Sequence, residues 1–303
     1  IIFWMTIIMP NQFTGKTVII SGGAGGIGLA LARELGANGM NVVIADIDQV
    51  QLATAEASLR DSDVKVVACP LDVTDFEQWQ AVVSEAKKHF GKVHMVVNNA
   101  GVGGLPSRLE DANHDAWRWA IDVNLMGVVY GAQAATPSLK EHGEGGWIIN
   151  VASMAGMGGM PYADAYCATK AAVVSLSEGW AAELKPFGIH VSVLCPAFVK
   201  TQIHNSHRNM QEKYKSAIKQ STAPTVDADV IKGAAALVEA GIPPELLAKR
   251  VVEAVASKQR YIFTHPNYRN DIAARGSRLD DAFADAQASP LVGHLINEKV
   301  TSF

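Results

Sequence analysis

A glycine-rich turn between a predicted strand and a predicted helix is the feature that most constrains the fold of this 303-residue chain. The β-branched run at residues 17–20 leads into SGGAGGIG at residues 21–28, and residues 29–35 have helical periodicity. In this arrangement the first N–H groups of the helix bind a pyrophosphate, and the missing Cβ atoms let it approach. The segment therefore predicts a dinucleotide site, the alternative being glycines that only make a tight turn.

A second buried strand, residues 41–45, ends at Asp46, 18 positions after Gly28. A carboxylate at this place can accept hydrogen bonds from the adenosine ribose hydroxyls and would repel a 2′-phosphate. No Lys or Arg stands in the glycine loop or directly after Asp46. The sequence therefore favours NAD over NADP, and the alternative for Asp46 is a strand end that faces solvent.

Strands and helices continue to alternate along the chain. We expect strands at residues 65–69, 93–97, 147–151, 189–194 and 261–263, and helices at residues 75–90, 114–140, 163–185 and 245–256. This alternation predicts an α/β fold, with a single-domain, Rossmann-like, doubly wound parallel sheet that carries helices on both faces. Ligands of such sheets bind beyond the carboxyl ends of the strands.

The composition shows no break that would divide the chain into two domains. We predict an N-terminal extension at residues 1–13, a dinucleotide-binding domain at residues 14–270 and a C-terminal tail at residues 271–303. Within the domain, a C-terminal segment at about residues 198–250 is expected to cover the substrate. The apolar stretch at residues 1–9 is shorter than the ~20 residues that span a bilayer, so no membrane partner is expected.

Charge and cysteine content exclude other classes of protein. The net charge of −4, with 26 basic residues scattered among 30 acidic ones, argues against nucleic-acid binding. Three cysteines without C-x-x-C or Cys/His clustering fit reduced thiols in a cytoplasmic protein. The histidines show no metal-ligand spacing, so no metal is expected.

Several motifs stand at the predicted strand ends. They are Gly22-x-x-x-Gly26-x-Gly28, Asn98-Asn99-Ala100-Gly101, Asn124, Ser153, Tyr166-x-x-x-Lys170 and Pro196-x-x-x-x-Thr201. In this order and spacing, over roughly residues 14–201, the chain resembles the short-chain dehydrogenase/reductase (SDR) family. One departure is Ala197, where that family usually has glycine. A small residue there can still let a nicotinamide carboxamide approach the backbone.

Two tyrosines stand four residues apart in MPYADAYCATK, residues 160–170, and only the second has a lysine four positions after it. Lys170 lies one helical turn after Tyr166, and a nearby ammonium favours the phenolate of a side chain whose free pKa is ~10. We therefore predict that Tyr166 removes the hydroxyl proton while a hydride leaves the same carbon of an alcohol. Tyr162, at the start of the helix shortly after Pro161 in a first-turn position, is interpreted as a pocket wall, with ordinary packing as the alternative.

The residues and the resemblance together assign the site. The catalytic residues are Asn124, Ser153, Tyr166 and Lys170, in which Ser153 orients the substrate oxygen and Asn124, by resemblance, bends its helix and holds a relay water. The alternatives are a turn or N-cap serine for Ser153 and an exposed asparagine for Asn124. The cofactor-binding residues are Gly22, Gly25, Gly26, Ile27, Gly28, Asp46, Ile47, Asp72, Val73, Asn99, Ala100, Gly101, Tyr166, Lys170, Pro196, Ala197, Val199 and Thr201. The substrate residues are Met154, Met160, Tyr162, Phe198 and Ile203.

These assignments predict an NAD-dependent oxidoreductase that interconverts a secondary alcohol, apolar or aromatic, and a ketone. The tail at residues 240–266 is similar to that of bacterial Cα-dehydrogenases, which oxidise benzylic alcohols in lignin-derived aryl ethers. An NADPH-linked ketone reductase and a non-catalytic NAD-sensing protein on the same fold are the alternatives, and a sensor would not need Ser153, Tyr166 and Lys170 together. By resemblance, we also expect a homodimer or homotetramer that assembles through the long helices.

Overall fold

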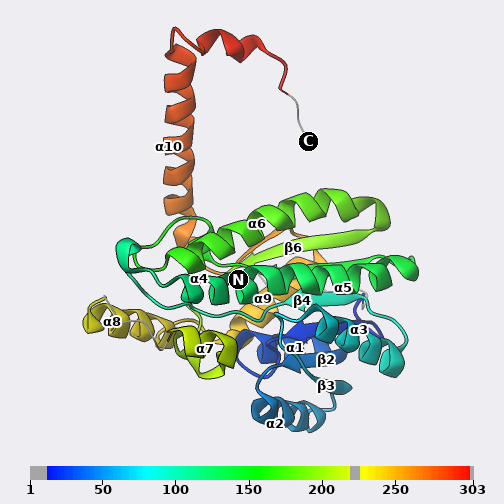
Figure 1. Cartoon of the computed structure of the whole chain (residues 1–303). Coiled ribbons are helices and arrows are strands. Elements are labelled where there is room, and N and C mark those ends of the chain that lie inside the picture. Colours follow the sequence, from blue (N-terminus) through cyan, green and yellow to red (C-terminus); the bar gives the residue numbers. More distant parts are fainter. Residues whose placement is uncertain (1–11, 219–225, 301–303) are drawn as a thin grey trace, which may run out of the picture. The chain divides into compact units, whose positions relative to one another are not determined.

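A computed structural model of the chain describes residues 12–218 and 226–300, and it contains one seven-stranded parallel sheet (Figure 1). The strand order is β3-β2-β1-β4-β5-β6-β7. The strands are β1 (Thr17–Ser21), β2 (Asn41–Asp46), β3 (Val66–Pro70), β4 (Met95–Asn98), β5 (Gly146–Val151), β6 (Ile189–Cys195) and β7 (Tyr261–Phe263). This order reverses between β1 and β4, which confirms the predicted doubly wound sheet and places the ligand crevice at that point.

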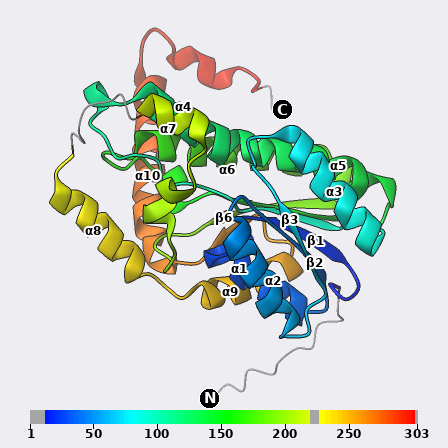
Figure 2. The same cartoon turned by 60° about the horizontal axis from the view of Figure 1, so that its bottom comes forward.

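Helices cover both faces of the sheet, as Figure 2 shows. On one face lie α1 (Gly26–Ala37), α2 (Gln49–Arg60) and α9 (Pro244–Ala256). On the other lie α3 (Phe76–Phe90), α5 (Gly127–Glu141) and α6 (Asp164–Leu184). Each face has its own core of fully buried aliphatic side chains, so the strands β1, β4 and β5 between them are apolar on both sides.

Local sequence signals explain why the helices begin and end where they do. Asp75 caps α3, because its carboxylate accepts hydrogen bonds from the backbone N–H groups of Glu77 and Gln78. Gly91, with φ of 80°, ends the same helix in a conformation that side chains disfavour. Between these signals Trp79 and Val82 belong to the buried face, at the spacing of one helical turn.

Several elements differ from the sequence-based expectation. The expected single helix at residues 114–140 consists of α4 (His114–Ile121), a π-helical turn (Asp122–Met126) and α5. The helices α2, α7 (Glu212–Ile218), α8 (Ala228–Glu239) and α10 (Arg269–Ala288) had not been predicted. Of these, α2 buries only Leu52, Ala55 and Leu59, while α8 and α10 bury no side chain.

The chain divides into two compact units, residues 1–264 and residues 265–303. The limits that we predicted for the extension, the domain and the tail stay predictions. Two parts of the prediction lie outside the described residues: residues 1–11 of the extension and residues 219–225 of the region expected to cover the substrate. Phe13, at the end of the predicted extension, is buried and packs on Trp147 with ring centroids 5.6 Å apart. Among the described helices, none has the length and apolar content needed to cross a membrane.

Candidate active site

The glycine loop lies between β1 and α1, and its glycines stand where side chains would collide. A Cβ on Gly28 would lie 2.1 Å from the Gly22 carbonyl oxygen, and one on Gly22 would lie 2.9 Å from the Ala100 Cα. Gly22 and Gly26 also have φ of 64° and 50°, which glycine adopts at little cost. The loop therefore approaches the end of β4 closely, with the N-terminus of α1 directly behind it. This backbone cradle fits the pyrophosphate of a dinucleotide.

Asn99 holds the loop in place from the end of β4. Its side-chain amide donates to the carbonyl oxygens of Ser21 at 2.9 Å and Gly22 at 3.1 Å. The Ser21 hydroxyl in turn accepts hydrogen bonds from the backbone N–H groups of Asn99 at 3.0 Å and Ala100 at 3.2 Å. The ends of β1 and β4 are thus joined by four hydrogen bonds across the expected ligand crevice.

Asp46, at the end of β2, lies against the same loop. Its carboxylate accepts hydrogen bonds from the N–H groups of Ala24 at 3.1 Å and Asp48 at 3.0 Å. Burial raises the pKa of this carboxyl above its usual value, and the two backbone hydrogen bonds oppose that rise. The carboxylate is therefore fixed beside the glycine turn, where the sequence places the ribose acceptor.

Tyr166, Ser153 and Lys170 come together at the carboxyl end of β5. Ser153 follows β5, while Tyr166 and Lys170 lie in the first two turns of α6. The Ser153 side chain is hydrogen-bonded to the Tyr166 phenol, and the Lys170 Nζ lies 5.7 Å from the centroid of the Tyr166 ring. Ser153 also caps a short 3₁₀ turn by accepting from the Ala155 N–H, which confirms the turn interpretation, while its role toward the substrate stays a prediction.

Burial dominates the acid–base properties of this group. It raises the pKa of the Tyr166 phenol, which the hydrogen bond with Ser153 lowers again. It lowers the pKa of Lys170 to about 8, since only 3% of that residue is exposed. Lys170 is therefore mainly cationic at neutral pH, and its charge favours the phenolate form of Tyr166. The Nζ of Lys170 is held in place by donating to the Val151 carbonyl oxygen at 2.8 Å.

Asn124 lies in the π-helical turn and is fully buried rather than exposed. Its side chain accepts from the Val102 N–H at 2.8 Å and donates to the Val102 carbonyl oxygen at 2.9 Å. It also donates to the Thr169 hydroxyl at 3.3 Å. The side chain therefore ties the helix to the loop after β4 and to α6, and π-helical turns of this kind are frequent at functional sites.

The other expected cofactor residues follow the carboxyl ends of β1, β2, β3, β4 and β6. A Cβ on Gly101 would lie 3.4 Å from the Lys170 Nζ, and one on Gly26 would lie 3.2 Å from the Thr201 side chain. Gly25 is the N-cap of α1, and Ile27 in its first turn is partly buried against the core. Ile47 after β2 is partly exposed, whereas Val73 after β3 is buried. The Asp72 carboxylate accepts hydrogen bonds from Thr74 and from Gln211. Pro196 and Val199 are buried and Ala197 is half-buried after β6, and Val199 belongs to the core, so only its backbone can face a ligand.

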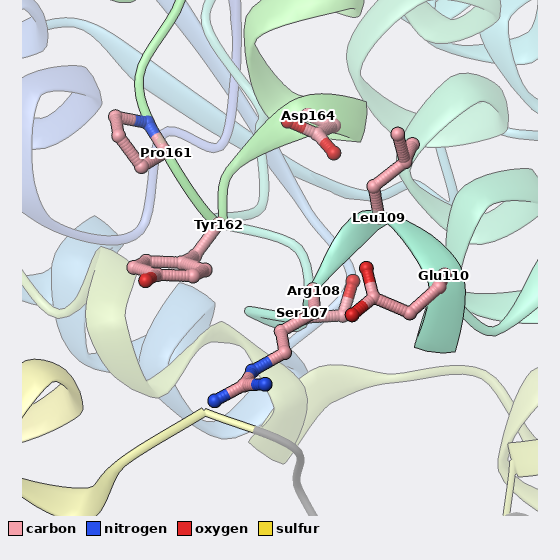
Figure 3. A pocket seen from close by; sticks show the side chains of 7 residues that line it. All are labelled: Ser107, Arg108, Leu109, Glu110, Pro161, Tyr162 and Asp164. Atoms are coloured by element: carbon pink, nitrogen blue, oxygen red, sulfur yellow. The ribbon is translucent and has the colours of Figure 1, made fainter.

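Of the expected substrate residues, Tyr162 lines a pocket. A pocket of about 420 Å³ is formed by two segments, residues 107–110 and 161–164 (Figure 3). Its lining residues are Ser107, Arg108, Leu109, Glu110, Pro161, Tyr162 and Asp164. Met160 and Tyr162 are 44% and 41% exposed, whereas Met154, Phe198 and Ile203 are half-buried.

The prediction that Pro161 and Tyr162 belong to the first turn of the helix is wrong. Helix α6 begins at Asp164, and Tyr162 precedes it with φ of 65°, in the left-handed region that a bulky side chain rarely adopts. The Tyr162 carbonyl oxygen accepts from the Ser107 N–H at 3.3 Å, which joins the two pocket segments. The left-handed turn thus directs the chain between Met160 and α6 and leaves Tyr162 at the pocket.

The segment after β6 is held over the site by side-chain hydrogen bonds. Tyr214 in α7 donates to the Asp122 carboxylate at 2.5 Å, and Gln211 donates to Asp72 at 2.9 Å. The Ser206 hydroxyl accepts from the Gly103 N–H at 3.0 Å. We call residues 203–218 the covering segment. It contacts the loops after β3 and β4 and the π-helical turn that carries Asn124.

Three potential metal ligands, His94, His142 and Glu144, lie within 4.8 Å of one another at the amino ends of the strands. His94 accepts from the Thr17 N–H at 3.1 Å and bonds Glu144 at 3.2 Å. His142 bonds the Val93 carbonyl oxygen at 2.8 Å and accepts from the Glu144 N–H at 3.1 Å. All four ring nitrogens are therefore engaged within the protein, and the group forms a structural polar network.

Sequence reasoning missed Ser21, Thr169, Val102 and the Tyr214–Asp122 pair. Ser21 carried a signal, because it is a polar residue at the end of a buried strand. The other contacts use backbone atoms or join side chains 45 and 92 positions apart, which no local pattern reveals.

Comparisons with known proteins agree with this geometry. A family model described as short chain dehydrogenase matches residues 16–212. A C alpha-dehydrogenase from Sphingobium sp. is 29% identical over 281 residues, which cover 92% of this chain and 90% of that protein. A CLA biosynthesis dehydrogenase/reductase from Lactiplantibacillus plantarum is 30% identical, over 89% of this chain and 94% of that protein. The crystal structure of a short chain dehydrogenase/reductase from Burkholderia phymatum in complex with NAD superposes with a TM-score of 0.85 at 33% identity, and it covers 89% of this chain and 95% of that one.

Proposed function

Because the chain belongs to the short-chain dehydrogenase family, we propose that it is an NAD-dependent oxidoreductase that interconverts a secondary alcohol and a ketone. One observation carries the proposal: Ser153 is hydrogen-bonded to the Tyr166 phenol, with the Lys170 ammonium beside the same ring. A protein that only senses NAD has no use for this combination. The dehydrogenase names of the relatives support the same activity.

In oxidation, Tyr166 takes the hydroxyl proton of the substrate. The Lys170 charge and the Ser153 hydroxyl stabilise the phenolate, and Ser153 is also placed to hold the substrate oxygen. NAD, when bound, supplies the nicotinamide carbon that accepts the hydride. Asn124 keeps the loop after β4 and α6 in register, and by family resemblance its turn holds a water that returns the proton to solvent.

The residues around the crevice fit NAD. The glycine cradle provides backbone N–H groups for the pyrophosphate, and the Asp46 carboxylate provides acceptors for the ribose hydroxyls. The same carboxylate would repel the 2′-phosphate of NADP, because Ile47 and Asp48, which follow it, supply no positive charge. The NAD complex of the Burkholderia phymatum relative supports this assignment.

We further propose that the substrate is an apolar or aromatic alcohol. The support is the apolar or aromatic character of the residues that the sequence assigns to the substrate, Met154, Met160, Tyr162, Phe198 and Ile203, of which Tyr162 lines the pocket. The C alpha-dehydrogenase of Sphingobium sp., similar over 92% of this chain, supports a benzylic alcohol as the first compound to test. A cytoplasmic location is also proposed, supported by three free cysteines that are all buried.

The test of the proposed activity is the variant Tyr166→Phe. We expect NAD-linked turnover to fall by about 10²–10⁴-fold, because the phenol oxygen that accepts the proton is lost. Benzylic, cyclic and steroidal alcohols would be screened with the unchanged protein by NADH absorbance, and the best of them used for the variant. NADH binding, followed by its fluorescence, should stay within about threefold of wild type.

The matched control is Tyr130→Phe, which removes the same oxygen from a ring in α5 that packs on Phe76 with centroids 5.6 Å apart. Its turnover should equal that of the wild type. Near-normal turnover of Tyr166→Phe on every oxidised alcohol would rule out Tyr166 as the base. Absence of turnover on all alcohols, with intact NADH binding, would instead favour a sensor.

A further inference from the structure

Helix α10 is long, exposed and amphipathic. It has 20 residues, and none of them is buried in the structure. Leu279 and Phe283 are 49% and 77% exposed, although both are large and apolar. Helices in proteins are stabilised mainly by packing of one apolar face rather than by intrinsic helix propensity. Helix α10 therefore presents a face that needs a partner.

The spacing of that face indicates what kind of partner it needs. Its apolar and small residues follow one another at intervals of four, three, four and three positions, which is the repeat of a helix that packs along another helix. They are Ile272, Gly276, Leu279, Phe283 and Ala286. Gly276 lies near the middle and lets a second backbone approach closely. The pattern extends over almost the whole helix, which is about 30 Å long at 1.5 Å per residue.

The charges on α10 are arranged by halves. The first ten residues contain Arg269, Arg275 and Arg278 with one acidic residue, Asp271, whereas the last ten contain Asp280, Asp281 and Asp285 with no basic residue. Two copies packed antiparallel about a twofold axis would bring the basic half of each against the acidic half of the other. Two parallel copies would instead place like charges together. Among the residues that the structure describes, these arginines and aspartates form no ion pair.

We propose that α10 pairs antiparallel with α10 of a second copy of this chain, through the Ile272–Gly276–Leu279–Phe283–Ala286 stripe. The partner is a second copy of this chain for two reasons. An antiparallel copy places its acidic half against the basic half of α10, and the apolar residues have the repeat that paired helices use. This contact is independent of the proposed catalytic activity.

Charge reversal tests the pairing in the full-length chain. The acidic variant carries Arg275→Glu and Arg278→Glu, and the basic variant carries Asp280→Lys and Asp285→Lys. Each variant alone should pair about tenfold more weakly than wild type, because the two halves of α10 then carry charge of mainly the same sign. An equimolar mixture of the two should regain wild-type pairing. All replacements are good helix formers, and circular dichroism would check that helix content is kept.

The readout is energy transfer between copies that are labelled at Ser277→Cys, an exposed position on α10 away from the stripe. Native Cys69, Cys167 and Cys195 are buried, so the new thiol takes the label. The matched control, Arg60→Glu with Lys88→Glu, makes the same change of net charge on α2 and α3. Transfer in the control should equal wild type.

The proposal would be overturned if both charge variants kept the energy transfer of wild type. It would also be overturned if the mixture showed no more energy transfer than either variant alone, since α10 would then dock on another surface. A third variant, Leu279→Ser with Phe283→Ser, should lose transfer without recovery in any mixture. Retention of transfer by this variant would show that the stripe is not the contact.

Discussion

At the scale of single residues, Lys170 shows how function opposes stability. In the proposed mechanism its ammonium acts on Tyr166, yet the side chain is 3% exposed and has the Val151 carbonyl as its hydrogen-bond acceptor at 2.8 Å. Burial lowers its pKa from 10.5 to about 8, which means that the folded protein holds the charged form at a cost of roughly 3 kcal/mol. In the proposed mechanism, the action of the charge on the Tyr166 phenol is what offsets this cost.

We therefore predict that Lys170→Met is more stable than wild type but inactive. At pH 7 the free energy of unfolding should rise by roughly 2 kcal/mol, since the lost hydrogen bond offsets about 1 kcal/mol. Between pH 8 and 10.5 only the unfolded wild-type chain keeps the Lys170 proton, so wild-type stability rises with pH and the advantage of the variant shrinks.

Urea unfolding at pH 7 and pH 10 measures both effects, with turnover followed in parallel. Lys88→Met, which changes an exposed lysine of α3, serves as the control and should alter stability little at either pH. A Lys170→Met protein that is less stable than wild type at pH 7 would contradict the argument.

At the scale of elements, the covering segment is fastened by few contacts. The hydrogen bond from Tyr214 to Asp122 joins α7 to the π-helical turn, and the Tyr214 ring is buried in the core beneath it. A hydrogen bond to a charged group contributes about 1.5–3 kcal/mol. Its loss would leave the body of the protein unchanged and shift α7 toward an undocked state.

We predict that Tyr214→Phe raises the KM for the alcohol by about tenfold while kcat stays within about threefold of wild type. Hydrogen exchange of the α7 amides should accelerate, and Tyr130→Phe should change neither quantity. A fall in kcat without a change in KM would place Tyr214 in the chemical step instead.

The elements also show what the sequence allows one to predict. The strands were predictable because their β-branched runs are buried on both faces, and Tyr166 with Lys170 because the two stand one helical turn apart. The helices α8 and α10 were not predicted, and neither of them buries a side chain. The left-handed turn at Tyr162 was also unpredictable, because glycine or asparagine usually marks such a turn.

At the scale of the whole molecule, the two ends of the parallel strands have separate roles. The candidate site lies at the carboxyl ends of the strands, while the network of His94, His142 and Glu144 lies at their amino ends. That network joins the starts of β1, β4 and β5, since Thr17, His94 and Glu144 stand at or just before them. Its hydrogen bonds require a neutral His94 ring, because Nδ1 accepts from the Thr17 N–H.

We predict that stability falls in mild acid through His94. Burial and the charge of Lys16 hold its pKa below the ordinary value of 6.5, so the unfolded chain binds the proton more readily. The contribution is complete above pH 6.5 and is lost as the pH falls toward the lowered pKa. Urea unfolding at pH 7.5 and 5.5 should show a smaller fall for His94→Asn than for wild type. His89→Asn, on the exposed face of α3, should behave like wild type, and an equal fall in both variants would contradict the prediction.

The four hydrogen bonds that join Asn99, Ala100 and Ser21 to the glycine loop have a consequence for the rate and cost of ligand exchange. Ordering a loop residue costs about 1–2 kcal/mol of backbone entropy, and here that cost is met when the chain folds. Cofactor arrival then does not have to order the glycine loop, and cofactor departure leaves this loop held by the same hydrogen bonds. Each catalytic cycle can therefore begin from the same rigid cradle.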